Sequence, residues 1–219
     1  DLDRFALERH QKAGQATASN FFDKEILPIE GKNAEGINDL VMADEGIRFD
    51  ASLDKLAGLK TVTEGGVITA GNASQITDGA AAVMICNDAG LKKIKSSPRA
   101  EIVSISVVGD DPVFMLTGPI PASIKALETA NLNIDDIDLY EVNEAFAPVP
   151  LAWASELKAD RSKLNVNGGA MALGHPLGAT GAKLMTTLIH EMERRESTYG
   201  LQAICEGGGT ANATIIKRL

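Results

Sequence analysis

The chain has 219 residues, and its 44% hydrophobic content is enough to bury a core in one large domain or two small ones. The net charge of −9 argues against nucleic acid or an anionic membrane as the main partner, although a local basic pocket for a phosphorylated ligand remains allowed. Cys86 and Cys205 lie far apart without zinc-ligand spacing, which predicts a reducing compartment, the cytoplasm, and no structural metal.

The first 70 residues predict a helix followed by loops. Residues 1–22 have the periodicity of an amphipathic helix, on whose charged and solvated face we expect His10. An extended stretch at 24–30 and a glycine-rich polar stretch at 65–74 follow, and the latter has strand character at 67–69. This part of the chain is expected to be an incomplete unit.

Residues 72–85 change from small to apolar side chains. The small residues suggest a closely packed helix that leads into an apolar strand, and Cys86 at its end is expected to be a buried strand residue rather than a nucleophile. The polar linker at 96–99 is the expected domain boundary.

Strands and helices alternate from residue 100 onward. Phe146, Val149, Trp153 and Leu157 recur at spacings of three and four, which places them on one face of a helix. The order βαβαβ predicts a layered α/β sandwich that closes with a hairpin. The expected strands are 101–109, 137–142, 201–205 and 212–219, and further helices are expected at 121–131 and 182–195, the latter with His190 on a solvated face.

Three motifs in this part could carry chemistry. NEAF begins at Asn143, at the carboxyl end of a predicted strand, where open α/β sheets present side chains to a ligand crevice. NGGAMALGHPLGATGA places His175 ahead of a helix, and CEGGG sets Cys205 against three glycines. The spacing matches neither GxxxxGK[ST] nor GxGxxG, so neither phosphate-binding loop is present.

The residue types in these motifs suit one kind of chemistry. An imidazole can take a proton from a thiol and then donate a hydrogen bond to an oxyanion, and a thiol with a pKa near neutral can move protons to and from carbon. Glycine amides, free of side chains, make good oxyanion donors. Together these groups favour reactions at a thioester carbonyl and its acidic α-carbon.

In this order and at these intervals, the three motifs resemble the thiolase family of acyl-CoA acetyltransferases, as do GPIPASIKALE and GNASQITDGAAAV. The resemblance covers essentially the whole chain and implies an α/β fold, the layered αβαβα sandwich of two related halves with a loop domain inserted in the first. It implies here an incomplete first half and a complete C-terminal half. The corresponding parts are the remainder of the loop domain at 1–73, the end of the N-terminal half at 74–97, and the C-terminal domain at 98–219.

The resemblance also implies catalytic roles. His175 is similar to the base that activates the nucleophilic cysteine and later polarises the thioester oxygen. Cys205 is similar to the second cysteine, which abstracts the α-proton of acetyl-CoA in condensation or protonates the enolate in cleavage. Asn143 would hold a water in one oxyanion hole, and the amide of Gly207 would contribute to the other.

Substrate contacts follow from the same resemblance. Ser74 of GNAS and Arg48 of EGIRFDASL look like coenzyme A contacts, and Phe146 borders the expected acyl pocket. The substrates would be acyl-CoA and acetyl-CoA, with no metal or redox cofactor, and the assembly a homodimer or homotetramer.

One departure from the family concerns the nucleophile. The acyl-accepting cysteine of thiolases lies in a turn of the first half, and nothing in this chain resembles that turn. We therefore expect the chain to be the latter part of a thiolase, with the N-terminal segment missing, cleaved or carried on a separate chain. Two alternatives stay open: a noncatalytic thiolase-like binder of coenzyme A or lipid, and a condensing enzyme of the ketoacyl-synthase type, which would be expected to use two histidines.

Overall fold

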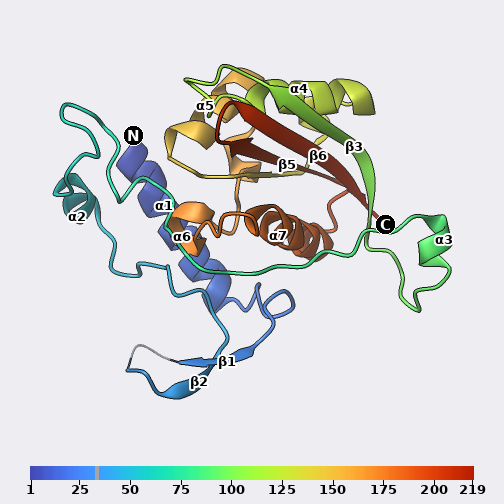
Figure 1. Cartoon of the computed structure of the whole chain (residues 1–219), viewed down its shortest axis with the longest axis horizontal. Helices are drawn as coiled ribbons and strands as arrows, with labels where there is room; N and C mark the ends of the chain where they lie inside the picture. Colours follow the sequence, from blue (N-terminus) through green and yellow to red (C-terminus); the bar gives the residue numbers. More distant parts are fainter. Residues whose placement is uncertain (33–34) are drawn as a thin grey trace.

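A four-stranded mixed sheet forms the centre of the protein (Figure 1). The computed structural model describes residues 1–32 and 35–219. The strand order is β3-β6-β5-β4, with β4 parallel to β5 and the other neighbours antiparallel. Helices α4 and α5 cover one face of the sheet and α7 lies against the other, which confirms a layered α/β sandwich with a closing hairpin. The bounds are β3 (Ala100–Gly109), β4 (Leu139–Val142), β5 (Tyr199–Glu206), β6 (Thr210–Arg218), α4 (Pro119–Ala130), α5 (Pro148–Leu157) and α7 (Thr180–Arg195).

The main core lies between the sheet and the helices α4 and α5. Trp153 of α5 is fully buried and meets the ring of Tyr140 edge to face, with 5.2 Å between the ring centroids. Its Nε1 donates a hydrogen bond of 2.8 Å to Ser123 Oγ of α4, so the indole brings its polar atom into the core with a partner. The expected core position of Trp153 is confirmed.

Proline sets where the two helices begin. Proline is tolerated in the first turn of a helix because that turn has no hydrogen-bond acceptor for its N–H. Helix α4 therefore starts at Pro119, two residues before the expected start at Pro121, and α5 starts at Pro148. Phe146 consequently precedes α5, and its expected place on that helix was wrong.

The N-terminal part surrounds helix α1 and has little regular structure. α1 packs against the short helix α6, near the glycine-rich motif of His175. His10 of α1 is buried, and its Nδ1 accepts a hydrogen bond of 3.1 Å from the backbone N–H of Arg48, so its expected solvated position was wrong. The remaining elements are α1 (Leu2–Ala18), β1 (Ile29–Lys32), β2 (Asn38–Val41), α2 (Leu53–Ala57), α3 (Asp88–Leu91), α6 (Ala170–Leu173) and the 3₁₀ helices at Ile134–Asp136 and Arg161–Lys163.

The segment from residue 74 to 87 differs most from expectation. It forms neither the expected helix nor the expected strand, and Ile76, Met84 and Ile85 are exposed by 103%, 77% and 73%. Cys86 is exposed rather than buried. A strand needs a neighbour for its backbone N–H and C=O groups, and within the described ranges no strand pairs with residues 76–87. The expected strand at 67–69 is likewise reduced to a single bridge between Thr61 and Thr69.

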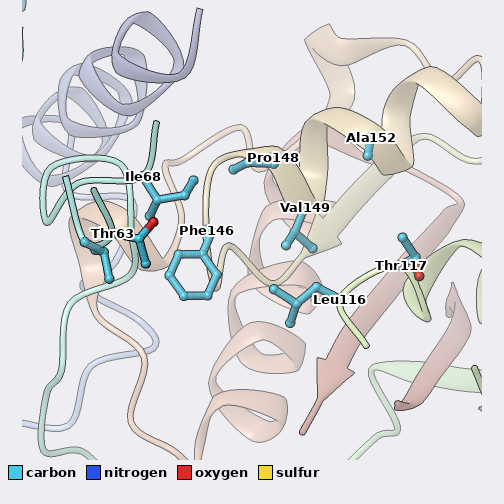
Figure 2. Close-up of a pocket in the computed structure, with 9 residues that line it drawn as sticks. Thr63, Ile68, Leu116, Thr117, Phe146, Pro148, Val149 and Ala152 are labelled. Atoms are coloured by element: carbon cyan, nitrogen blue, oxygen red, sulfur yellow. The ribbon is translucent and has the colours of Figure 1, made fainter. Parts of the chain in front are cut away.

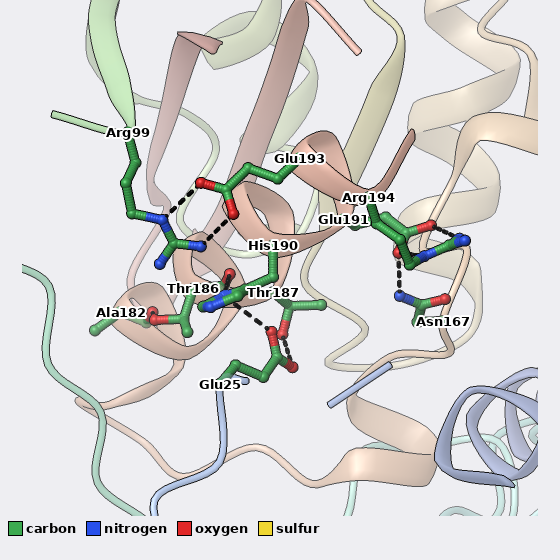
Figure 3. A network of polar contacts seen from close by, with 10 residues as sticks. All are labelled: Glu25, Arg99, Asn167, Ala182, Thr186, Thr187, His190, Glu191, Glu193 and Arg194. Atoms are coloured by element: carbon green, nitrogen blue, oxygen red, sulfur yellow. Dashed lines mark hydrogen bonds and ion pairs between the residues drawn. The ribbon is translucent and has the colours of Figure 1, made fainter. Parts of the chain in front are cut away.

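Charged side chains connect the C-terminal half of α7 to the rest of the protein (Figure 3). Glu25, which follows α1, lies with its carboxylate 3.5 Å from His190 Nδ1 and accepts a hydrogen bond of 3.0 Å from Thr187 Oγ1. His190 Nδ1 also donates to Thr186 O, and only 12% of its side chain is exposed, so this histidine is not solvated as expected.

No helix in the described part of the chain is long and apolar enough to cross a membrane.

The buried carboxyl group of Glu25 predicts a pH-dependent stability. Burial raises its pKa from 4.5 to about 7. The folded state therefore holds this proton more tightly than the unfolded state, and the resulting stability is present below pH 4.5 and lost as the pH rises to 7. We expect Glu25→Gln, which mimics the protonated acid, to raise the free energy of unfolding at pH 8 by up to about 3 kcal/mol and to leave it unchanged at pH 4.

Urea denaturation at the two pH values measures this difference, and Glu30→Gln at an exposed position is the matched control. Equal stabilisation of the Glu25 variant at both pH values would show that the carboxyl group is not the cause.

Candidate active site

Asn143 stands where β4 ends, and the sheet fixes its backbone. Its N–H donates to Ala203 O of β5 at 2.9 Å, and its side chain is buried. The side-chain Nδ2 lies 3.4 Å from His175 Nε2, and the Asn143 side chain is close enough to the Cys205 thiol to oppose the rise of its pKa. Its Oδ1 is buried and accepts no hydrogen bond from any described residue, which leaves one polar atom of the site unsatisfied. The structure therefore brings Asn143, His175 and Cys205 together.

The turn before His175 requires glycine. Gly174 has φ +81°, and a Cβ there would lie 2.5 Å from Thr77 Oγ1. The imidazole Nδ1 lies 2.6 Å from Thr180 Oγ1, and that hydroxyl donates its own hydrogen to Pro176 O at 3.0 Å. Since the hydroxyl hydrogen is already used, we assign the imidazole hydrogen to Nδ1. Nε2 is then an unprotonated acceptor facing Asn143.

The electrostatic environment keeps this imidazole neutral. Burial lowers the pKa of His175 from 6.5, and the positive charge of Lys183 on α7 lowers it further. A neutral imidazole with its free nitrogen toward the site is the form that a general base needs at neutral pH.

Cys205 lies near the end of β5, opposite Ala211 in the hairpin with β6. Burial raises the pKa of its thiol, while a hydrogen bond from Asn143 opposes this shift. Because burial is the larger effect, the thiol carries its proton at neutral pH and can act as a proton donor.

The three glycines after Cys205 have different tasks. Gly208 and Gly209 have φ +81° and +84° and turn the hairpin, and a Cβ at Gly209 would lie 2.6 Å from Asp110 O. Gly207 is exposed, and no atom lies within 4 Å of the place where its Cβ would be, which leaves space beside its backbone for a substrate.

Asp110 joins this hairpin to the loop between β3 and α4. Its backbone N–H donates to Gly209 O at 2.6 Å, and its carboxylate accepts a hydrogen bond of 2.7 Å from Thr117 Oγ1. Thr117 is also a wall residue of an apolar pocket. Asp110 is therefore hydrogen-bonded both to the glycine hairpin and to the wall of that pocket.

The apolar pocket has a volume of about 390 Å³ and lies beside the NEAF motif (Figure 2). The ring of Phe146 stands between the loop of Thr63 and Ile68 on one side and the α5 start with Val149 on the other. The pocket can accept an apolar group. Its lining consists of Val62, Thr63, Ile68, Leu116, Thr117, Phe146, Pro148, Val149 and Ala152.

The two expected coenzyme A contacts lie in different surroundings. Ser74 donates its backbone N–H to Ala145 O at 2.9 Å, next to the bridge between Ala73 and Phe146, so it runs alongside the NEAF segment. Arg48 is exposed on a separate loop, and none of its described contacts reaches Asn143, His175 or Cys205.

Sequence patterns did not single out a buried clamp beneath Asn143. Glu144 is fully buried, and its carboxylate accepts hydrogen bonds from Asn165 Nδ2 at 2.7 Å and from the N–H of Met171 at 3.2 Å. Arg9 Nη1 lies 3.8 Å from the same carboxylate. A Cβ at Gly169 would lie 2.1 Å from Glu144 Cδ, so the glycine makes room for the acid. The signal available in the sequence was an acid inside an otherwise apolar segment, since such a group needs buried partners.

Among the described residues, no group of three His, Cys, Asp or Glu side chains is placed to hold a metal ion.

Comparisons with known proteins agree with this geometry. Sequence models of the thiolase N-terminal domain and of the thiolase C-terminal domain match residues 1–89 and 96–218. The chain is 52% identical over its whole length to the steroid 3-ketoacyl-CoA thiolase FadA6 of Mycobacterium tuberculosis, of which it covers 52%. It is 47% identical to the 3-ketoacyl-CoA thiolase of Photorhabdus laumondii over 99% of its own length and 57% of the relative.

Solved structures show the same fold. The acetyl-CoA acetyltransferase of Bacillus anthracis matches with a TM-score of 0.94 and 42% identity, over 100% of this chain and 55% of that one. Human mitochondrial 3-ketoacyl-CoA thiolase in complex with CoA matches with a TM-score of 0.91 and 42% identity, over 100% of this chain and 54% of that one. The present chain thus spans about half the length of these relatives. The chain belongs to the thiolase family.

Proposed function

We propose that the chain carries the base, the oxyanion donors and the proton donor of a thiolase. The reaction is thioester-dependent Claisen condensation or thiolytic cleavage between acyl-CoA and acetyl-CoA. The observation that carries this proposal is that His175, Asn143 and Cys205 lie together, with His175 Nε2 3.4 Å from Asn143 Nδ2 and the Asn143 side chain beside the Cys205 thiol.

Each group has a role in cleavage. His175 Nε2 takes the proton of a nucleophilic thiol, and the resulting imidazolium then donates a hydrogen bond to the thioester oxygen. The thiolate forms a bond to the β-keto carbon, and when this tetrahedral adduct collapses to the acyl-enzyme, the bond between the α- and β-carbons breaks and its electron pair passes to the α-carbon as an enolate. The thiol of Cys205 then gives its proton to that carbon. Asn143, through a bound water, and the amide of Gly207 are proposed to stabilise the oxyanions.

The substrate groups fit the surrounding surfaces. Ser74 and the exposed guanidinium of Arg48 are proposed to contact coenzyme A, and the apolar pocket beside Phe146 is proposed to take the acyl group. The names of the relatives, which act on 3-ketoacyl-CoA thioesters, support an acyl-CoA substrate.

We further propose that the acyl-accepting cysteine comes from the part of a thiolase that these residues do not include. Cys86 is exposed on an extended segment without regular structure, and no described contact links it to the catalytic groups. The exposed apolar side chains of that segment, and of Ile105 and Val107 on β3, support a surface that this other part covers. A homodimer or homotetramer in the cytoplasm completes the proposal.

Reconstitution tests the function. The chain alone should not cleave acetoacetyl-CoA, because it holds no covalent acyl carrier. Activity should appear in a fusion that places, ahead of this chain, the part of the Bacillus anthracis acetyl-CoA acetyltransferase that the chain does not cover; this fusion is called the reconstituted enzyme below. Release of acetyl-CoA measures the reaction, and Cys86→Ser should leave the reconstituted enzyme active.

Thiolysis by the isolated chain, after its mass has been confirmed, would contradict the proposed division of groups. Coenzyme A binding by the reconstituted enzyme without any turnover would instead favour the noncatalytic binder.

A further inference from the structure

Gln75 joins two segments that lie far apart in the sequence. Its Nε2 donates hydrogen bonds to Gly46 O and to Met171 O, both at 2.7 Å. Its backbone is used as well: its N–H donates to Ala170 O at 3.4 Å, and its C=O accepts from the N–H of His175 at 3.1 Å. A side-chain amide has two hydrogens, and here each of them has a carbonyl partner.

One end of this connection leads to the expected coenzyme A contact. Gly46 lies two residues before Arg48, whose N–H is fixed by His10 Nδ1. A Cβ at Gly46 would lie 2.8 Å from Gln75 Oε1 and 2.7 Å from Ala172 O, so the loop approaches the amide and α6 too closely for any larger residue. The backbone of the Arg48 loop at Gly46 therefore contacts the side-chain amide of Gln75 directly.

The other end leads to the base. Met171 belongs to α6, a helix of four residues that runs into Gly174 and His175. So short a helix has little stability of its own, and its position depends on its contacts. Gln75 holds Met171 O through the side chain and the N–H of His175 through the backbone, so it fixes both the helix and the turn that follows.

We propose that Gln75 is a positioning residue that couples the Arg48 loop to the His175 turn. The proposal rests on the proposed function only for the identity of the ligands at the two ends. Its consequence is that a displacement of the coenzyme A loop reaches the base through this amide, in addition to the packing of Ile47 against Ala172 and Leu173.

The three histidines of the chain make this coupling measurable. Burial lowers the pKa of His10 and of His175 from 6.5, with Arg48 and Lys183 respectively adding to the effect. Gln75→Met keeps the length of the side chain but donates nothing to either carbonyl, so both ends should loosen and admit water. NMR titration of the Gln75→Met chain with ¹³C-labelled histidine should show that the pKa of His10 and of His175 has risen toward 6.5. The signals of His190, from the far end of α7, should be the same in the variant as in the parent chain.

Gln15→Leu on the exposed side of α1 is the matched control and should move neither reporter. Unchanged titration of both His10 and His175 in Gln75→Met would overturn the proposal, and a shift of only one would show that Gln75 holds one segment without coupling the two. If Gln75→Met does not fold, Gln75→Asn keeps the amide but is too short to reach both carbonyls. It should produce smaller shifts in the same direction, and titration like that of the parent chain would again overturn the coupling.

Adenosine 3′,5′-bisphosphate separates this proposal from the proposed function, because it carries the adenine and phosphate groups of coenzyme A without the arm that would reach His175. Added to the parent chain, it should shift the signals of both His10 and His175, and in Gln75→Met the shift of His175 should be smaller while that of His10 remains. If it moves no signal in either chain, the proposed coenzyme A site at Arg48 is wrong, while the titration still decides whether Gln75 couples the two segments. Equal shifts of His175 in both chains would overturn the coupling.

Discussion

In the reconstituted enzyme, His175→Ala is expected to lower kcat for acetoacetyl-CoA thiolysis by at least about a thousandfold. The imidazole performs two tasks, because its Nε2 first accepts the thiol proton and then donates to the thioester oxygen. A methyl group can do neither. KM should change much less, since the expected coenzyme A contacts at Ser74 and Arg48 stay in place.

Steady-state rates of acetyl-CoA release measure this effect. His190→Ala is the matched control, because His190 contacts Glu25 and Thr186 at a distance from the site and should leave kcat within about twofold of the parent. Circular dichroism should show both variants folded. A loss of less than about tenfold in His175→Ala would mean that another group is the base.

Cys205→Ser is expected to separate acylation from proton transfer. A serine hydroxyl has a far higher pKa than a thiol and is a poor acid or base at neutral pH, so condensation and exchange of the α-proton should collapse. Acyl-enzyme formation from acetyl-CoA should survive, since the imidazole of His175 and the acyl-accepting cysteine are untouched. The acyl group should never reside on Cys205.

Two measurements on the same reconstituted enzyme read the two steps. Mass spectrometry of the quenched enzyme detects and locates the acetyl group, and deuterium incorporation into acetyl-CoA follows the α-proton. Cys86→Ser serves as the control and should change neither reading. Loss of acylation with intact exchange would reverse the assigned roles, and an acetyl group on Cys205 would make that residue the nucleophile.

Regular elements with a buried face were the most predictable part of the fold. The closing hairpin follows from two apolar runs that flank three glycines, and its turn needs the positive φ of Gly208 and Gly209. The helix of Trp153 follows from its spacing, although proline rather than periodicity sets its start at Pro148.

Segments whose partners are remote or absent were not predictable. Residues 80–85 carry the composition of a buried element, yet no described strand pairs with them and they remain extended. His10 was expected to be exposed but is buried. It lies on a polar helix and is covered by the loop of Arg48, and no local sequence pattern predicts that contact.

The residues of the candidate site that lie within sequence motifs were predictable. Asn143, His175 and Cys205 follow from the family resemblance, and the structure brings them together. Gln75 was missed because its partners are backbone carbonyls of distant segments, which carry no residue-specific signal. The buried contacts of Glu144 were missed because Asn165, Met171 and Arg9 come from segments far away in the sequence.

Asp110 has a consequence for how the enzyme would tell substrates apart. Its backbone holds Gly209 and its carboxylate holds Thr117, so the wall of the proposed acyl pocket and the turn with the Gly207 amide form one mechanical unit. An acyl chain that presses on the wall also shifts the amide, and such a shift matters most when negative charge has built up on the carbonyl oxygen. Under the proposed function, we therefore expect selectivity for chain shape to appear in kcat, and we expect poorly shaped thioesters still to bind and to compete with good ones.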